Sequence, residues 1–186
     1  MIIDFHTHTY PRKVVEHVID TLTSRSVIDI TLASDGTLFG LKDAMQRDGV
    51  DLSVVLPVAS RPDQVDSINE LNVKSLKDSA ETKVTFFAAI HPHTEKVPEV
   101  LKRIKNSGFK GIKLHPYNQG VQADDISYIR LLYEAESLGL YTVIHAGRDL
   151  SFPGKYVSTP PQLKKLVDEV HPEHFILAHM GGCYDW

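Results

Sequence analysis

The sequence predicts an α/β fold built around a parallel sheet, and three observations support this. Runs of strand-forming apolar residues alternate with amphipathic stretches throughout the 186 residues. The strand-like runs are apolar on both faces, as in strands covered by helices on each side. Short segments rich in glycine, proline and aspartate separate these runs. With 42% hydrophobic and 24% charged residues, the composition is that of a globular protein, and we expect a single domain over residues 1–186.

The first half of the chain is predicted to hold three strands and three helices. The strands are expected at 1–8 (MIIDFHTH), 51–58 (DLSVVLPV) and 83–90 (KVTFFAAI), which are apolar runs of strand length. Apolar residues at helical spacing predict helices at 11–24, 37–48 and 63–80. Gly49 marks the end of the second helix. Residues 28–35 are expected to form a loop or a short additional element.

The second half repeats this alternation. Strands are expected at 109–114 (FKGIKL), 141–146 (YTVIHA) and 174–180 (HFILAHM), and helices at 95–105, 125–137 and 159–170. The last helix begins with Thr159 as a cap and Pro160 at the first helical position. No Gly-x-Gly-x-x-Gly follows the first strand and no Walker lysine loop is present, which disfavours dinucleotide-binding and P-loop folds.

The number of units indicates the architecture. Six strand–helix units are expected here, whereas a closed TIM-type (β/α)8 barrel usually takes about 250 residues. We therefore expect a barrel of this type with about six βα units in this chain, incomplete at its C-terminal side.

Histidines mark the carboxyl ends of the predicted strands. Of 10 histidines, six lie at or within two residues of such an end: His6, His8, His91, His115, His145 and His179. In parallel α/β proteins, binding and catalytic groups gather at this edge of the sheet. Alternate residues of a strand share a face, so His6 and His8 can reach one ion, and imidazole nitrogen is a common ligand of zinc, iron, nickel and copper. The pattern predicts one metal-binding rim.

Individual residues have alternative interpretations. His145 lies in an apolar strand, where an unpaired imidazole is costly, and is predicted to be a metal ligand rather than a satisfied core histidine. His179 is predicted to act at the site as a metal ligand, as an acid or base, or in substrate contact. Lys113 and His115 share one face of their strand. Lys113 could pair with a substrate carboxylate or, when carboxylated, bridge two metals, and His115 could instead stack on Pro116 as a structural residue.

Weaker site predictions fall on three further residues. His91 and His93 flank a proline and could be loop residues, and Asp4 could orient a ligand histidine from behind. The remaining histidines, His17, His171 and His174, are predicted to be structural or at the surface.

Four segments, taken together, resemble the amidohydrolase superfamily. They are Ile-Asp-Phe-His-Thr-His at 3–8, Gly-Ile-Lys-Leu-His-Pro at 111–116, Ile-His-Ala-Gly at 144–147 and Leu-Ala-His-Met-Gly-Gly at 177–182. They occur in the order found in that superfamily. Within it, the chain resembles the amidohydrolase-related branch, which includes metal-dependent hydrolases and enzymes like aminocarboxymuconate-semialdehyde decarboxylase.

This resemblance implies a distorted (β/α)8 barrel with a divalent metal, usually zinc, held by His6, His8 and His145. His179 matches a histidine that binds a second metal in some members and orients water or substrate in others. The family also carries an aspartate at the end of strand eight. This chain shows no strand eight, and the role is not transferred to Asp185.

The leading hypothesis is a metal-dependent hydrolase that uses metal-activated water on a small carbonyl substrate. The substrate is expected to be an amide, ester or lactone that bears a carboxylate. His179 and Lys113 are the expected catalytic residues, and His115 and Arg148 are expected to bind substrate. The alternatives are a decarboxylase of the same family, a non-catalytic metal-binding fragment or pseudoenzyme and, with less support, a metal-dependent phosphoesterase.

Composition narrows the expected partners. The net charge is −4 and no basic block is present, so nucleic acid and anionic membrane surfaces are not expected to bind. We find no apolar run of spanning length and no signal peptide. The single cysteine, Cys183, cannot form an internal disulfide, which fits a cytoplasmic protein. A small-molecule substrate is the expected partner, and the exposed edges of an open sheet also favour a homo-oligomer.

Overall fold

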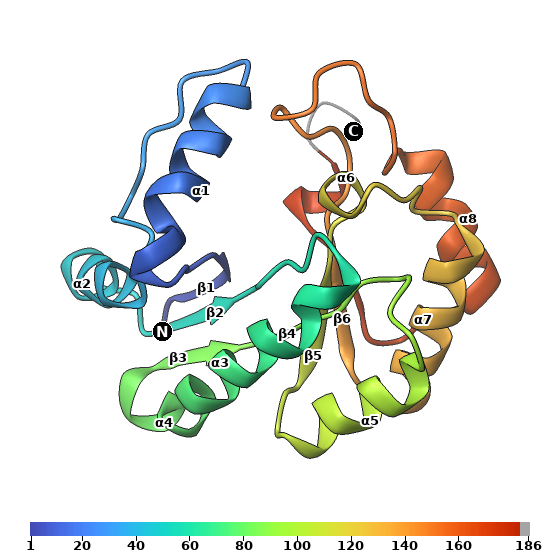
Figure 1. Ribbon diagram of the computed structural model, residues 1–186, viewed down its shortest axis with the longest axis horizontal. Coiled ribbons are helices and arrows are strands. Elements are labelled where there is room, and N and C mark those ends of the chain that lie inside the picture. The colour runs from blue at the N-terminus through green and yellow to red at the C-terminus, as the bar shows by residue number, and fades with distance from the viewer. Residues whose placement is uncertain (183–186) are drawn as a thin grey trace.

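The computed structural model describes residues 1–182, and the strands within them form two parallel sheets (Figure 1). Cys183 and Asp185 lie outside the described residues. The strands are β1 (Ile3–Thr7), β2 (Leu52–Val55), β3 (Val84–Phe86), β4 (Ala88–Ala89), β5 (Gly111–Leu114), β6 (Tyr141–Ile144) and β7 (Phe175–Leu177). Their order is β1-β2-β3 in one sheet and β4-β5-β6-β7 in the other, and each neighbouring pair is parallel.

The two sheets are joined within the segment that was predicted as one strand, residues 83–90. β3 pairs with β2, whereas β4 pairs with β5, so the segment changes partner at Phe87. The Asn69 side chain makes hydrogen bonds to both backbone polar groups of Ala89. It accepts from the N–H and donates to the C=O, at 2.8 Å each. The six predicted βα units are therefore present, with the third strand in two parts.

The helices lie along the outside of the strands (Figure 1). They are α1 (Arg12–Arg25), α2 (Leu38–Asp48), α3 (Val65–Lys77), α4 (Ser79–Thr82), α5 (Val97–Asn106), α6 (Pro116–Gln119), α7 (Ile126–Ser137) and α8 (Pro160–Val170), with 3-10 turns η1 (Pro62–Gln64) and η2 (His179–Gly181). Gly49 ends α2 at φ 72°, as the sequence predicts. None of the helices in this part of the chain is long and apolar enough to cross a membrane.

Several boundaries differ from the prediction. The helix expected at 63–80 divides into η1, α3 and α4, and the strand expected at 174–180 ends at Leu177 and turns into η2. The four-residue helix α6 was not predicted, because one turn is too short to show helical periodicity. It begins at Pro116, directly after His115.

The core lies between the strands and the outer helices. Ile112 and Leu114 of β5 are fully buried, as are Leu101 of α5 and Leu131 of α7. Within residues 1–182, β1 pairs only with β2 and β7 only with β6, so the barrel is not closed. This arrangement confirms the predicted (β/α)8-type fold with about six units in this chain.

Candidate functional site

Five histidines from four strand ends form a continuous series of ring contacts. His6 lies in β1 and His8 just after it, and the others follow β5, β6 and β7. The ring centroids are 5.1 Å apart for His8 and His6, 4.9 Å for His6 and His179, 4.7 Å for His179 and His145, and 4.3 Å for His145 and His115. The parallel strands bring together residues that are distant in the sequence, so the predicted gathering of these histidines is observed.

Lys113 contacts this series at His6. Its side chain is fully buried in β5, and its Nζ lies 3.5 Å from His6 Nε2. Desolvation lowers the pKa of Lys113 to about 7. Within the described part of the chain, no carboxylate pairs with it.

The buried imidazoles are neutral at physiological pH. Burial, followed by the charge of Lys113, lowers the pKa of His6 to about 2. Burial, followed by the neighbouring His179, lowers the pKa of His145 to about 3. Burial also holds the pKa of His115 well below its usual range. Neutral rings keep a nitrogen lone pair free, which is the state that binds a metal.

His115, His145 and Asp149 form the group best placed to hold an ion. Each offers a ligand atom, and these atoms lie within 4.8 Å of one another, the only such group found in residues 1–182. His115 Nδ1 and His145 Nε2 are buried without a hydrogen-bond partner. Buried polar nitrogens are rarely left unpaired, and both nitrogens are available as metal ligands. Two imidazoles and a carboxylate also match the usual ligands of zinc, and the residues fit a divalent metal.

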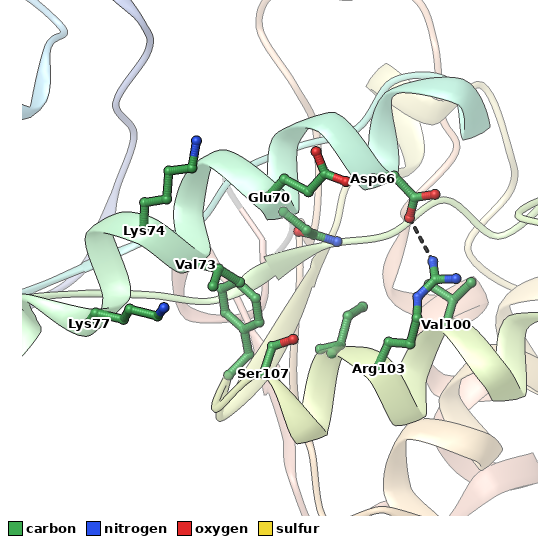
Figure 2. A pocket seen from close by; sticks show the side chains of 11 residues that line it. Asp66, Glu70, Val73, Lys74, Lys77, Val100, Arg103 and Ser107 are labelled. Atoms are coloured by element: carbon green, nitrogen blue, oxygen red, sulfur yellow. Dashed lines mark hydrogen bonds and ion pairs between the residues drawn. The ribbon is translucent and has the colours of Figure 1, made fainter.

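Of two cavities, one borders a histidine of the ring series and the other does not. One of about 480 Å³ borders His8 and extends between α1 and α3, past Val18 and Leu71. Another, of about 710 Å³, lies between α3 and α5, and the ion pair between Arg103 and Asp66 spans it at 2.7 Å (Figure 2). The lining of the second cavity contains no histidine, and we place the functional site at the histidines instead.

Sequence comparison assigns the family. Residues 3–186 match the family model described as amidohydrolase. The chain belongs to the amidohydrolase family. No curated protein matches this amidohydrolase.

Solved structures similar to this amidohydrolase have low sequence identity and support the fold alone. Metarhizium anisopliae IDCase in its apo form has a TM-score of 0.70 at 15% identity, covering 97% of this chain and 65% of that one. For 2,6-dihydroxybenzoate decarboxylase from Rhizobium the TM-score is 0.62 at 15% identity, with 97% and 66% covered. A putative 2-pyrone-4,6-dicarboxylic acid hydrolase from Pseudomonas putida has a TM-score of 0.52 at 15% identity, with 91% and 52% covered. The chain thus spans 52% to 66% of the length of these relatives.

Not every predicted residue of this amidohydrolase joins the cluster. Arg148 is exposed, and its guanidinium lies over the Tyr156 ring at 5.6 Å. His91 and His93 contact each other, with centroids 5.4 Å apart. Asp4 accepts a hydrogen bond from the backbone N–H of His6 at 3.1 Å. The metal roles of His6, His8 and His145 stay predictions.

Sequence reasoning missed Asp149. It lies beyond the end of β6, with its side chain 13% exposed and its Oδ2 3.8 Å from His115 Nε2. The signal was available, because an acidic residue in the loop after a strand also lies at the functional edge of a parallel barrel.

Proposed function

We propose that this chain forms part of a metal-dependent hydrolase acting on a small carbonyl compound that carries a carboxylate. One observation carries the proposal: His115, His145 and Asp149 each offer a ligand atom within 4.8 Å of the others, and each of the two rings also has a buried nitrogen without a hydrogen-bond partner. His6 and His8, at the end of β1, are the further ligands that we propose. An amide, ester or lactone is the substrate that this chemistry suits.

The proposed site assigns separate tasks to the protein's own side chains. A divalent metal, when bound, supplies a Lewis acid that polarises a carbonyl and acidifies water. Partial burial, then the charge of Lys113, lowers the pKa of His179, so its ring stays neutral. With His145 Nε2 as a ligand, His145 Nδ1–H would donate to His179 Nε2, and His179 Nδ1–H would be left to hold a water or substrate oxygen. The Nε2 of His179 lies 3.1 Å from His145 Nδ1, and this contact orients the ring.

Cationic groups are proposed to bind the acidic substrate. Lys113 lies inside the barrel, where its ammonium form would stabilise negative charge that develops on the substrate. Arg148 is exposed in the loop after β6, and its guanidinium would bind the carboxylate of the substrate.

A decarboxylase is the second candidate. The solved structures similar to this chain include 2,6-dihydroxybenzoate decarboxylase and 5-carboxyvanillate decarboxylase, as well as a putative hydrolase. A Lewis acid beside cationic side chains suits carbon–carbon cleavage of a carboxylate as well as hydrolysis.

An assay of product type separates these functions. The zinc-loaded chain would be incubated with carboxylate-bearing esters, amides, lactones and hydroxybenzoates, and the released acid and carbon dioxide measured. We expect acid release that disappears in His145→Ala and persists in His17→Ala, a control in the exposed part of α1. Carbon dioxide release would favour the decarboxylase. Turnover that survives His145→Ala would contradict both.

A further inference from the structure

We propose that Gln119 is a positioning residue that holds the backbone of His115 and thereby the geometry of the stacked pair His115 and His145. The inference rests on the metal role proposed above for these two histidines. Gln119 lies at the end of α6 and is 6% exposed. It is placed to act on the site only through His115.

The amide of Gln119 uses its full hydrogen-bonding capacity. Its Oε1 accepts from the His115 backbone N–H at 2.9 Å and from the Tyr128 hydroxyl at 2.6 Å. Its Nε2 donates to the carbonyl oxygens of Ala59 at 3.1 Å and Ile90 at 2.7 Å. If the amide were flipped, its NH2 group would face the His115 N–H, and its oxygen would face two carbonyl oxygens. The contacts therefore determine which way the amide points.

These partners come from different parts of the barrel. Ala59 follows β2, Ile90 follows β4, His115 follows β5, and Tyr128 lies in α7. One side chain thus connects the segments that follow three of the strands. Active sites of parallel barrels lie at the carboxyl ends of the strands. A small displacement of these segments therefore changes the geometry of the binding residues.

His115 is held at both of its backbone polar groups. Its N–H donates to the Gln119 side chain, and its C=O accepts from the Gln119 backbone N–H at 2.9 Å. The ring of His115 is held less closely, since its Nδ1 is unpartnered and its Nε2 lies 3.8 Å from Asp149 Oδ2. The backbone therefore determines where the ring stacks, 4.3 Å from His145 with an interplanar angle of 23°.

The other half of the pair is held in a comparable way. The Ser158 hydroxyl, fully buried, donates to the His145 carbonyl oxygen at 2.6 Å, and the His145 N–H donates to the Leu114 carbonyl at 3.0 Å. The Leu114 carbonyl and the His115 N–H belong to one peptide group, so His145 and Gln119 hold that group at its two ends, and only the Ser158 contact holds His145 separately. Loss of the Gln119 contact should therefore displace His115 from the position in which it stacks on His145.

A matched control separates positioning from simple stabilisation. Asn69 makes two hydrogen bonds to the backbone of Ala89, in the same strand segment as Ile90. Asn69→Leu removes a half-buried amide that also binds strand backbone, without touching His115. Gln119→Leu and Gln119→Met remove the contacts of Gln119, and Tyr128→Phe removes one donor while leaving the glutamine in place.

The test compares histidine ring signals of the full-length chain by long-range ¹H–¹⁵N NMR, in metal-free protein. We expect the signals of His115 and His145 to shift in both Gln119 variants, to shift less in Tyr128→Phe, and to stay at their wild-type positions in Asn69→Leu. Unchanged ring signals in Gln119→Met and Tyr128→Phe, or equal shifts in Asn69→Leu, would overturn the inference.

Zinc titration by calorimetry provides the second readout. We expect zinc affinity to fall about 10- to 100-fold in the Gln119 variants, the usual loss when an outer partner of a ligand is removed, and to hold in Asn69→Leu. Wild-type affinity in Gln119→Met would count against the positioning role. A wild-type chain that binds no zinc would refute the proposed function, while the metal-free ring signals would still decide the role of Gln119.

Discussion

The imidazole rings of His115 and His145 stack with centroids 4.3 Å apart, and each ring keeps one buried nitrogen without a hydrogen-bond partner. Adjacent parallel strands produce this arrangement: β5 pairs with β6 in register from Gly111 with Tyr141 to Leu114 with Ile144, so the next residue on each strand is a histidine. The Nδ1 of His145 is 3.1 Å from His179 Nε2, so the unpartnered Nε2 is the His145 nitrogen left to bind an ion.

The first prediction concerns metal content. His115→Ala, His145→Ala and Asp149→Ala are each expected to lose zinc, because each removes one ligand from a group within 4.8 Å. His6→Ala is expected to lose zinc as well, because His6 is one of the further ligands proposed at the end of β1. Elemental analysis of purified protein gives the stoichiometry, with His171→Ala, exposed at the end of α8, as the control. If Asp149→Ala retained zinc and His6→Ala lost it, the metal ligands would have to be assigned to the end of β1 and not to Asp149.

Lys113 provides a prediction about stability. Replacement by methionine, which has a similar length and no charge, should raise the free energy of unfolding by about 1 to 4 kcal/mol, as when other buried charges are replaced by apolar residues. The same change should abolish turnover, since it removes the buried cation. Chemical denaturation of chelator-treated protein measures the first effect.

The gain from Lys113→Met should depend on pH. Desolvation lowers the pKa of Lys113 to about 7 in the folded protein, while the unfolded lysine titrates near its ordinary value. The folded state is thus penalised fully below pH 7, and the penalty fades as pH rises toward about 10.4, where the unfolded lysine also loses its proton. A gain that is constant from pH 6 to pH 10 would contradict this account.

The fold was predictable because most of its signals are local. Apolar periodicity identified six strand–helix units, and the histidines at strand ends followed from that assignment. The break at Phe87 was not predictable, since it depends on a change of strand partner and on Asn69, which is distant in sequence. The contacts of Gln119 were hidden for the same reason, because a glutamine after a strand carries no periodic signal.

A second stability prediction concerns the link between α7 and the segment before β7. Glu136 accepts from the His174 ring at 2.6 Å and from the backbone N–H groups of Glu173 and His174. Glu136→Ala should lower the free energy of unfolding by about 2 kcal/mol at pH 7. Glu134→Ala in the same helix is the control, since among residues 1–182 only the backbone oxygen of Glu134, and not its side chain, is hydrogen-bonded to a side chain.

The effect of Glu136→Ala should also vanish in acid. Burial alone would raise the pKa of Glu136, but the hydrogen bonds from His174 and Glu173 outweigh it and lower the pKa. A lowered carboxylate pKa contributes stability above the ordinary value near 4.3 that is lost as pH falls through the folded value. The two proteins should therefore converge in stability below that pH. A difference that persists in acid would show that packing, and not the carboxylate, carries the effect.

The last prediction concerns the open edge of β1. This strand pairs only with β2 among the described residues, and its apolar side chains remain accessible, Ile3 at 44% and Phe5 at 40%. Unpaired edges with exposed apolar residues recruit further strands, and a charged side chain on such an edge prevents it. We expect the purified chain to self-associate and Ile3→Lys to shift it toward the monomer in sedimentation velocity.

Ile3 is the informative position because Phe5 already packs edge-on against Phe87, with ring centroids 5.7 Å apart, so changing Phe5 would also disturb the interior. Phe39→Lys is the matched control, since Phe39 is 62% exposed but lies in helix α2 and not in a strand. Equal dissociation in both variants would assign self-association to general surface hydrophobicity. A wild-type chain that stays monomeric at high concentration would mean that β1 is protected by its twist and by Asp4 and His6, the polar side chains that alternate with its apolar ones.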